Sequence, residues 1–410
     1  MNPVSALIHH GYQAPDGFVS PQTAVHKAST VIFPNVKALR ERTWLDKSGY
    51  TYGLHGTPTT FTLEERIAFL EGAKHAVLLP SGLAAIAQVN MALLHQGDEV
   101  LLPDNAYGPH KAFAQAELKR WGISHKLYDP MDLADLASRI TPQTRLIWLE
   151  AAGSVTLEFP DILSMVRLAK DKGVLTALDN TWGAGLAFKP FDLEPQGAAP
   201  WGVDVSVHAL TKYPSGGGDV LMGSVTTCDE GLAQQLKLSH MRLGFGISGN
   251  DAELVLRSLP SMEMRYRHHD LTTRALATWC LQQSAFVQVL HPAVVDSPGH
   301  THWRRLCADD KPAVGAVHTG GLAAGMLSLR FDPAFSIAQI DTFCNALKLF
   351  KLGFSWGGPM SLIVPYDLSS LRSMEAPDML KGGFVRLAVG LEAAEDLIAD
   401  LSQALKFASM

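Results

Sequence analysis

From about residue 61 onward, short apolar runs alternate with amphipathic stretches along the chain. The amphipathic stretches repeat their apolar residues every three or four positions, as expected of helices that cover a core. The apolar runs are nearly continuous, which is typical of strands buried on both faces. Expected strands cover 76–80, 99–103, 145–150, 174–179 and 204–210, and expected helices cover 61–72, 83–94, 110–122 and 161–173. This alternation predicts an α/β fold with a mainly parallel central sheet and helices on both faces.

The pattern differs at the two ends of the chain. Residues 1–60 are irregular and rich in Gly, Pro, Thr and Tyr, which indicates either a functional arm or a poorly ordered segment. After about residue 250, longer helices are followed by strands near 325–331 and 384–390. A chain of 410 residues also exceeds the roughly 250–300 residues of a single core. We therefore expect an arm (1–60), a large α/β domain (61–255) and a smaller C-terminal α+β domain (256–410).

Chemically capable side chains follow several of the expected strands. Ser81-Gly82 follows the first strand, Tyr107 lies four residues after the second, Asp179 ends another, and Thr211-Lys212 follow the strand at 204–210. In an open α/β sheet, ligands bind outside the carboxyl ends of the strands. A hydroxyl, an aromatic ring, a carboxylate and an amine should therefore converge at one edge, as in a cofactor site.

Each of these residues has an ordinary alternative when taken alone. Ser81 suits a helix cap, Asp179 a turn, Tyr107 a packed core and Lys212 a solvated surface. Gly216–Gly218 does not have the spacing of a dinucleotide-binding fingerprint. The order of the residues along one expected edge is what favours a shared site.

Composition narrows the possible partners. The net charge is −6 with 34 Lys and Arg, so no general footprint for nucleic acid is expected. The four cysteines form no CxxC pair, which argues against a zinc or redox site, and we expect no metal. The N-terminus lacks the features of a signal peptide. The most apolar run, 78–94, is interrupted by polar residues and is shorter than the ~20 residues of a membrane span. A soluble, cytoplasmic protein without a membrane partner is the expectation.

Seven segments in order resemble the Cys/Met-metabolism family of fold-type-I pyridoxal-phosphate enzymes. They are TYGLHGTPTTF (51–61), LLPSGLAA (78–85), NAYGP (105–109), LDNTWGAG (178–185), ALTKYPSGGGD (209–219), SWGG (355–358) and VRLAVGLE (385–392). Together they span nearly the whole chain. The resemblance implies an aminotransferase-like fold, with pyridoxal 5′-phosphate bound by the domain at 61–255.

The resemblance also implies roles for particular residues. Lys212 would hold the cofactor as a Schiff base and act as base and acid, because burial lowers the pKa of a lysine. Asp179 would keep the pyridine nitrogen protonated, and Tyr107 would stack on the cofactor ring. Lys212, Asp179 and Tyr107 would be the catalytic residues. The phosphate would be bound by Gly82, Leu83, Thr211 and, from a neighbouring subunit, Tyr52. The substrate carboxylate would pair with Arg386, while Ser355, Trp356 and Tyr107 would shape the pocket around it.

The implied activity is that of a carbon–sulfur lyase acting on a small sulfur amino acid. DNTW together with SWGG favours α,β-elimination of L-cystathionine to homocysteine, pyruvate and ammonia. The alternatives are a γ-acting relative (cystathionine γ-synthase, cystathionine γ-lyase or methionine γ-lyase), a broad cysteine-S-conjugate β-lyase and a non-catalytic protein that kept the fold. The family also implies a homotetramer built from two dimers with shared active sites.

Two positions depart from the family pattern. Leu54 occupies the place of an arginine that would contact the partner's phosphate, and the neighbouring His55 is a candidate substitute. Glu253 stands where a tyrosine is usual in the active-site wall. It could pair with the distal ammonium of cystathionine; its ordinary alternative is a helix-surface glutamate.

Overall fold

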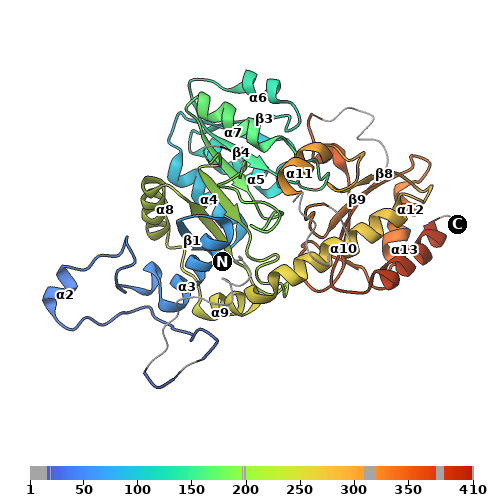
Figure 1. The fold of residues 1–410 in the computed structure, drawn as a ribbon. Coiled ribbons are helices and arrows are strands. Elements are labelled where there is room, and N and C mark those ends of the chain that lie inside the picture. Colours follow the sequence, from blue (N-terminus) through green and yellow to red (C-terminus); the bar gives the residue numbers. More distant parts are fainter. Residues whose placement is uncertain are drawn as a thin grey trace.

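The computed structural model describes residues 16–18, 20–195, 197, 200–308, 320–374 and 383–408. Its larger part is built on a seven-stranded sheet (Figure 1). The strands are β1 (His75–Leu79), β2 (Glu99–Pro103), β3 (Ser124–Tyr128), β4 (Thr144–Glu150), β5 (Leu175–Asp179), β6 (Val205–His208) and β7 (Gly223–Thr227). Their order is β1-β7-β6-β5-β4-β2-β3, and β7 runs opposite to the other strands of the sheet. The expected α/β fold with a mainly parallel sheet is confirmed.

Helices cover both faces of this sheet. One face packs against α4 (Gly82–Leu93), α5 (Gly108–Phe113) and α8 (Glu230–Leu243). The other packs against α3 (Pro58–Glu71), α6 (Leu133–Arg139), α7 (Ile162–Asp171) and α9 (Gly249–Ser258). Neighbouring strand residues alternate between the two cores, as Val77 and Leu78 do in β1. This double coverage is why the strands read as continuous apolar runs.

Local sequence signals place the helix ends next to the strand ends. The Thr57 side chain caps α3 in a capping box with Thr60, and Gly72 ends the helix in the left-handed conformation (φ 79°). The Ser81 side chain caps α4 by accepting the N–H of Ala84 at 3.0 Å. The first turn of α4 therefore begins directly after β1.

A second sheet has its own core. It has the order β10-β11-β12-β9-β8, formed by β8 (Phe286–Leu290), β9 (Met326–Phe331), β10 (Lys351–Leu352), β11 (Leu362–Tyr366) and β12 (Phe384–Ala388). Helices α12 (Ile337–Ala346) and α13 (Ala394–Ala408) pack on it, and α11 (His300–Cys307) packs into the core of the first sheet. The long helix α10 (Met262–Cys280) runs from one sheet to the other (Figure 1). The predicted boundaries at residues 60 and 255 stay predictions.

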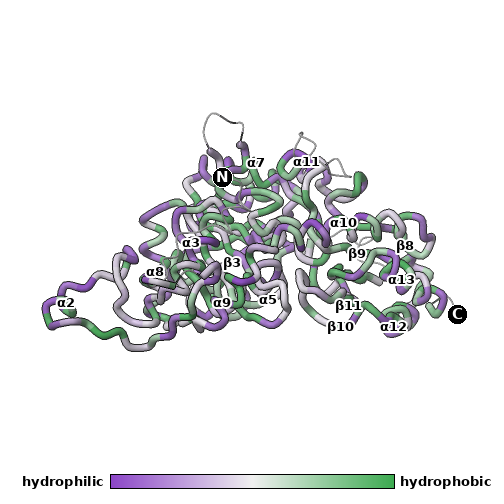
Figure 2. The backbone as a smooth tube through the Cα atoms, turned by 60° about the horizontal axis from the view of Figure 1, so that its bottom comes forward, coloured by the Kyte–Doolittle hydropathy of each residue, from purple (hydrophilic) through white to green (hydrophobic). Residues whose placement is uncertain are grey.

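The segment before α3 projects from the body of the molecule (Figure 1). It carries the short helix α2 (Val36–Arg40), which has no buried residue, and a β-bridge between Thr30 and Tyr52. Ile32 is 89% exposed, and apolar stretches appear along this segment in Figure 2. Exposed apolar groups on a projection are typical of an interaction surface.

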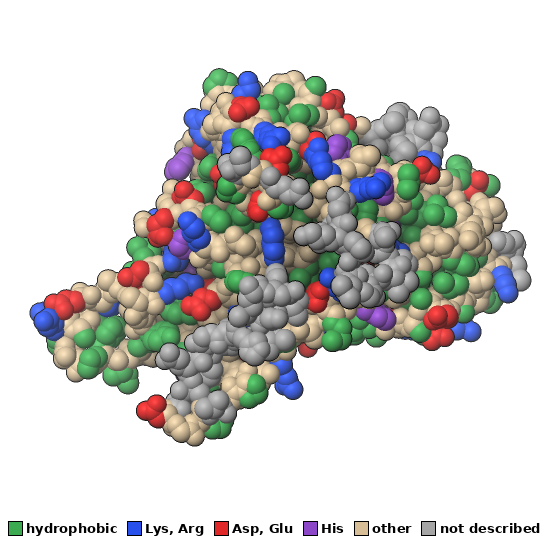
Figure 3. Space-filling model, viewed as in Figure 1, with side chains coloured by type: hydrophobic (Ala, Val, Ile, Leu, Met, Phe, Trp, Pro, Cys, Tyr) green, Lys and Arg blue, Asp and Glu red, His purple; other side chains and the backbone are tan. Residues whose placement is uncertain are grey.

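On the face shown in Figure 3, acidic and basic side chains are interspersed among the described residues. Within the described ranges, no helix combines the length and apolar character needed to cross a membrane.

Candidate active site

Lys212 lies in the turn after β6, where its backbone N–H donates to the carbonyl of Ala209. Its Nζ donates to Ser355 Oγ at 3.0 Å and lies 5.6 Å from the centroid of the Trp356 ring. Burial lowers the pKa of Lys212 to about 8; the charge of Arg386 lowers it further, and that of Asp179 opposes the change. About a tenth of this amine is therefore unprotonated at pH 7, far more than for a lysine at the ordinary pKa of 10.5, and the unprotonated form is the one a nucleophilic lysine requires.

Asp179 ends β5 and faces the same site. Its Oδ1 accepts the backbone N–H of Thr181 at 3.0 Å. Burial raises the pKa of Asp179, and the hydrogen bonds from Thr181 oppose this. A cationic N–H placed opposite the carboxylate would favour its charged form. Asp179 is thus suited to hold a proton on a ring nitrogen.

Tyr107 is held next to Asp179 by a residue that sequence reasoning missed. The backbone N–H of Tyr107 donates to Oε2 of Glu150 at 2.8 Å, and Glu150 pairs in register with Asp179 on the adjacent strand. Burial and the charge of Asp179 raise the pKa of Glu150 well above its usual value. Burial, Asp179 and Glu150 also raise the pKa of Tyr107, while Arg386 lowers it. The signal for Glu150 was present in the sequence, as a carboxylate ending the apolar strand RLIWLE.

The Glu150 contact gives a testable prediction. Glu150→Leu leaves the Tyr107 N–H without its acceptor, which costs about 1–3 kcal/mol. We expect kcat/KM to fall roughly 10- to 100-fold, at about 1.4 kcal/mol per decade. Glu150→Gln keeps an acceptor oxygen and should stay within about threefold of the parent. Steady-state kinetics of both variants checks this; equal losses in both would show that charge, and not the acceptor, matters.

The start of α4 is wedged against the lysine turn. A Cβ at Gly82 would lie 2.6 Å from the Cβ of Ala209, so only glycine permits this approach. The amides of Gly82 and Leu83 open the helix, where backbone N–H groups and the helix dipole favour a phosphate. The Thr211 hydroxyl donates to the carbonyl of Met222 at 3.1 Å and accepts its N–H at 3.0 Å. In this structure Thr211 therefore shapes the turn through these two bonds.

Arg386 is a buried cation on β12. It is 8% exposed, and among the described residues its Nε has no hydrogen-bond partner. Its guanidinium carbon lies 5.5 Å from the centroid of the Tyr366 ring. Burial lowers the pKa of Arg386, and Tyr366 opposes the change. No carboxylate pairs with this guanidinium in the part of the chain that the structure describes, and because a buried unpaired charge is costly, this position favours an anionic ligand.

The Ser355–Gly358 segment closes over Lys212. Ser355 has a φ of 147° and Gly357 a φ of 77°. A Cβ at Gly357 would lie 3.0 Å from the backbone N of Tyr213 and 3.1 Å from the carbonyl carbon of Lys212. The Trp356 ring also lies against Tyr213, with 5.5 Å between ring centroids. A non-glycine residue at positive φ that touches a reactive amine is typical of a functional site.

The remaining expected residues lie on other elements. Tyr52 is 45% exposed on the projecting segment, and Glu253 lies on α9, partly buried. The His55 ring stacks on Trp44 with 4.5 Å between centroids, and its Nδ1 lies 2.8 Å from the Thr51 hydroxyl. Burial lowers the pKa of His55, so its cationic form is disfavoured. This weakens the idea that His55 replaces the family arginine.

The residues present fit pyridoxal 5′-phosphate. They provide an amine of lowered pKa, a partly buried carboxylate whose charge acts on that amine, a half-exposed aromatic ring and a helix N-terminus narrowed by Gly82. Together with the mainly parallel sheet, they define the fold-type-I class of pyridoxal-phosphate enzymes.

Comparison with known proteins gives the family. The model of the Cys/Met metabolism PLP-dependent enzymes matches residues 4–406, and the chain belongs to this family. It is 37% identical to a cystathionine beta-lyase of Bordetella avium, over 92% of this chain and 90% of the relative. It is 33% identical to an L-alanine/L-glutamate racemase of Wolbachia pipientis, over 99% of this chain and 97% of the relative. The solved cystathionine gamma synthase of Xanthomonas oryzae pv. oryzae has a TM-score of 0.84 at 27% identity, covering 100% of this chain and 99% of that one.

The lowered pKa of Lys212 predicts how the cofactor-free protein takes up pyridoxal phosphate. Only the unprotonated amine attacks an aldehyde. Because the pKa is about 8 and not 10.5, the uptake rate should rise up to about pH 8 and level off above it. Stopped-flow absorbance across pH measures this rate. A rate still rising steeply at pH 10 would contradict the shift.

Proposed function

We propose that this protein is a carbon–sulfur lyase that converts L-cystathionine to homocysteine, pyruvate and ammonia by α,β-elimination. The observation that carries the proposal is the environment of the Lys212 amine. The amine donates a hydrogen bond to Ser355, its pKa is lowered, and the charges of Asp179 and Arg386 act on it. The 37% identity to the cystathionine beta-lyase of Bordetella avium supports this choice of reaction.

The chemistry divides among the residues of the site. When bound, pyridoxal phosphate supplies an electron sink for the negative charge that develops at Cα. Lys212 removes the Cα proton as an amine and, once protonated, donates to the leaving sulfur. Asp179 holds the proton on the ring nitrogen. Arg386 binds the α-carboxylate through its fork of N–H groups, and Tyr107 covers the face of the ring. The Ser355 hydroxyl orients the amine between its two tasks.

The proposal includes an assembly of subunits and roles for Glu253 and Tyr52. We propose a homotetramer of two dimers, in which Tyr52 reaches the phosphate site of the neighbouring chain and Glu253 pairs with the distal ammonium of cystathionine. The exposed apolar residues of the projecting segment support such an assembly. Sedimentation equilibrium tests the tetramer, and an unchanged KM for cystathionine in Glu253→Gln would count against the pairing. A cytoplasmic location remains a prediction.

Two other functions have specific support. The likeness to a cystathionine gamma synthase keeps γ-acting chemistry open. The likeness to an amino-acid racemase is compatible with the same residues, because racemisation also begins with removal of the Cα proton. In all three reactions Lys212 would remove the Cα proton, and they differ in the next step: loss of the thiol from Cβ, loss of the substituent from Cγ, or return of a proton to the opposite face of Cα.

Product analysis separates these functions. The purified protein is incubated with L-cystathionine, and the keto acid is identified by chromatography. Pyruvate with homocysteine supports the proposal, whereas 2-oxobutyrate with cysteine would point to γ-elimination. Parallel incubations with L-alanine and with succinyl- or acetyl-homoserine plus cysteine test the racemase and the synthase. Activity in one of these with none on cystathionine would refute the lyase.

A further inference from the structure

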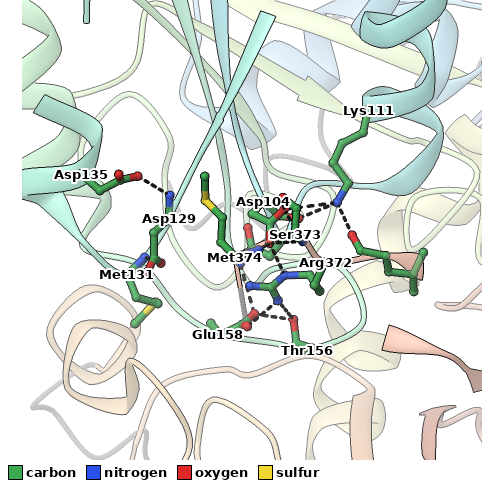
Figure 4. A network of polar contacts seen from close by, with 12 residues as sticks. Asp104, Lys111, Asp129, Met131, Asp135, Thr156, Glu158, Arg372, Ser373 and Met374 are labelled. Atoms are coloured by element: carbon green, nitrogen blue, oxygen red, sulfur yellow. Dashed lines mark hydrogen bonds and ion pairs between the residues drawn. The ribbon is translucent and has the colours of Figure 1, made fainter. Parts of the chain in front are cut away.

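A buried ion network joins the C-terminal domain to the loop that carries Tyr107 (Figure 4). Arg372 is 8% exposed, and its acceptors include Asp104, Thr156 and Glu158. Its Nε lies 3.0 Å from Oδ2 of Asp104, and one terminal nitrogen lies 2.6 Å from the Thr156 hydroxyl and 2.7 Å from Oε1 of Glu158. Asp104 and Glu158 follow β2 and β4 of the large sheet. One guanidinium therefore connects three segments that are distant in sequence.

Asp104 binds the rest of the same C-terminal segment. Its carboxylate accepts the backbone N–H and the hydroxyl of Ser373 at 3.0 and 2.7 Å, and the N–H of Met374 at 3.0 Å. Lys111 donates to the Asp104 carbonyl at 2.6 Å and to the Leu371 carbonyl at 2.5 Å. Burial would raise the pKa of Asp104, but the bonds from Ser373 and Arg372 outweigh it and lower the pKa. The charged groups of Asp104, Glu158 and Arg372 at the centre of the network are thus buried and hydrogen-bonded to one another.

Residues of the C-terminal domain also bind the loop after β4, at 151–158. Val155 and Leu157 adopt positive φ angles of 73° and 58°, which are costly for residues with large side chains. The Ser328 hydroxyl on β9 donates to the Val155 carbonyl at 2.5 Å, while Arg372 binds the residues that flank Leu157. This loop persists in its strained form because the C-terminal domain holds it at two points.

The contacts of Arg372 and Ser328 connect the two parts of the candidate active site, the Tyr107 loop and the strand that carries Arg386. The Asp104 loop continues into Tyr107, and the loop at 151–158 continues from Glu150, which binds the Tyr107 N–H. On the other side, Ser328 pairs in register with Arg386. The network therefore fixes the position of Tyr107 relative to the sheet that carries Arg386.

We propose that Arg372 is a positioning residue for amino-acid binding. Its planar fork holds the Tyr107 loop and the Arg386 sheet in the register needed to grip the amino acid between them. Lysine has the same charge but not the planar set of N–H donors, and a single ammonium group is poorly shaped to donate to Asp104, Thr156 and Glu158 together. The inference rests on the proposed function for the assignment of Tyr107 and Arg386.

The test measures amino-acid binding apart from turnover. L-Alanine, which has no leaving group at Cβ, is titrated into the cofactor-loaded protein, and its Kd is read from the change in visible absorption. Displacements of about 1 Å can cost 10²-fold, so we expect Kd to rise about 100-fold in Arg372→Met and about 10-fold in Arg372→Lys. Both variants should keep the absorption of cofactor bound to Lys212. Arg267→Met, which removes an exposed i,i+4 pair with Glu263 on α10, should leave Kd unchanged.

The outcomes distinguish positioning from simple stabilisation. If Arg372→Met fails to fold, Arg372→Lys decides, because it keeps a cation beside Asp104 and Glu158. A folded variant with a lower melting temperature and the parental Kd would overturn the inference. If the parent protein itself shows no response to L-alanine, the assignment of the site under the proposed function fails instead.

Discussion

Replacing Lys212 with alanine should lower turnover of cystathionine by at least about 10⁴-fold, since general acid–base catalysis alone contributes 10²–10⁴-fold. The visible absorption of the lysine-bound cofactor should disappear at the same time. The reason is that one amine both anchors the cofactor and moves the proton at Cα. Absorbance spectra and keto-acid assays of the purified variant measure the two effects.

A second partly buried lysine provides the matched control. Lys189 donates to the carbonyls of Leu70 and Gly185 at 2.5 and 2.7 Å, on the α3 side of the large domain. Lys189→Met should lose stability but keep the absorption band. Turnover by Lys212→Ala comparable to the parent, or loss of the band only in Lys189→Met, would contradict the assignment of Lys212.

Arg386→Ala should lower kcat/KM for cystathionine about 100- to 10,000-fold, mainly through KM. Two charge-assisted hydrogen bonds of about 1.5–3 kcal/mol each are lost, at about 1.4 kcal/mol per decade. Arg386→Lys should recover only part of this, because it keeps the charge without the fork. The cofactor band should be unaffected in both variants. Initial-rate kinetics separates KM from kcat.

An exposed arginine controls for loss of charge in general. Arg304 on α11 is exposed, and Arg304→Ala should leave KM unchanged. If Arg386→Ala bound cystathionine as tightly as the parent, the buried guanidinium would have some partner other than the substrate carboxylate.

Much of the fold could be predicted from apolar periodicity, and the exceptions have physical reasons. The strands β1, β2, β4, β5 and β6 are buried on both faces and appear as apolar runs. Strand β7 (GSVTT) was missed because it is rich in small hydroxyl residues and follows a glycine-rich turn. Strand β3 (SHKLY) was missed because it lies at the sheet edge, where polar side chains reach solvent.

The residues of the site also divide into those that could be predicted from the sequence and those that could not. Lys212, Asp179 and Tyr107 could be found because they follow strands, and the topology brings strand ends to one edge. Arg386 came from the family resemblance, since periodicity alone does not distinguish it within β12. Arg372 could not be found from the sequence, because its partners Asp104 and Glu158 are more than two hundred residues away in the chain. Such pairings depend on how the two domains pack, which local patterns do not encode.

The central claim is that the cofactor is attached to Lys212. The cofactor-loaded protein is treated with borohydride, which makes the link permanent, then digested and analysed by mass spectrometry. The account predicts a pyridoxyl group on the peptide that contains Lys212 and on no other. A pyridoxyl group on a different lysine, with an unmodified Lys212 peptide, would contradict it.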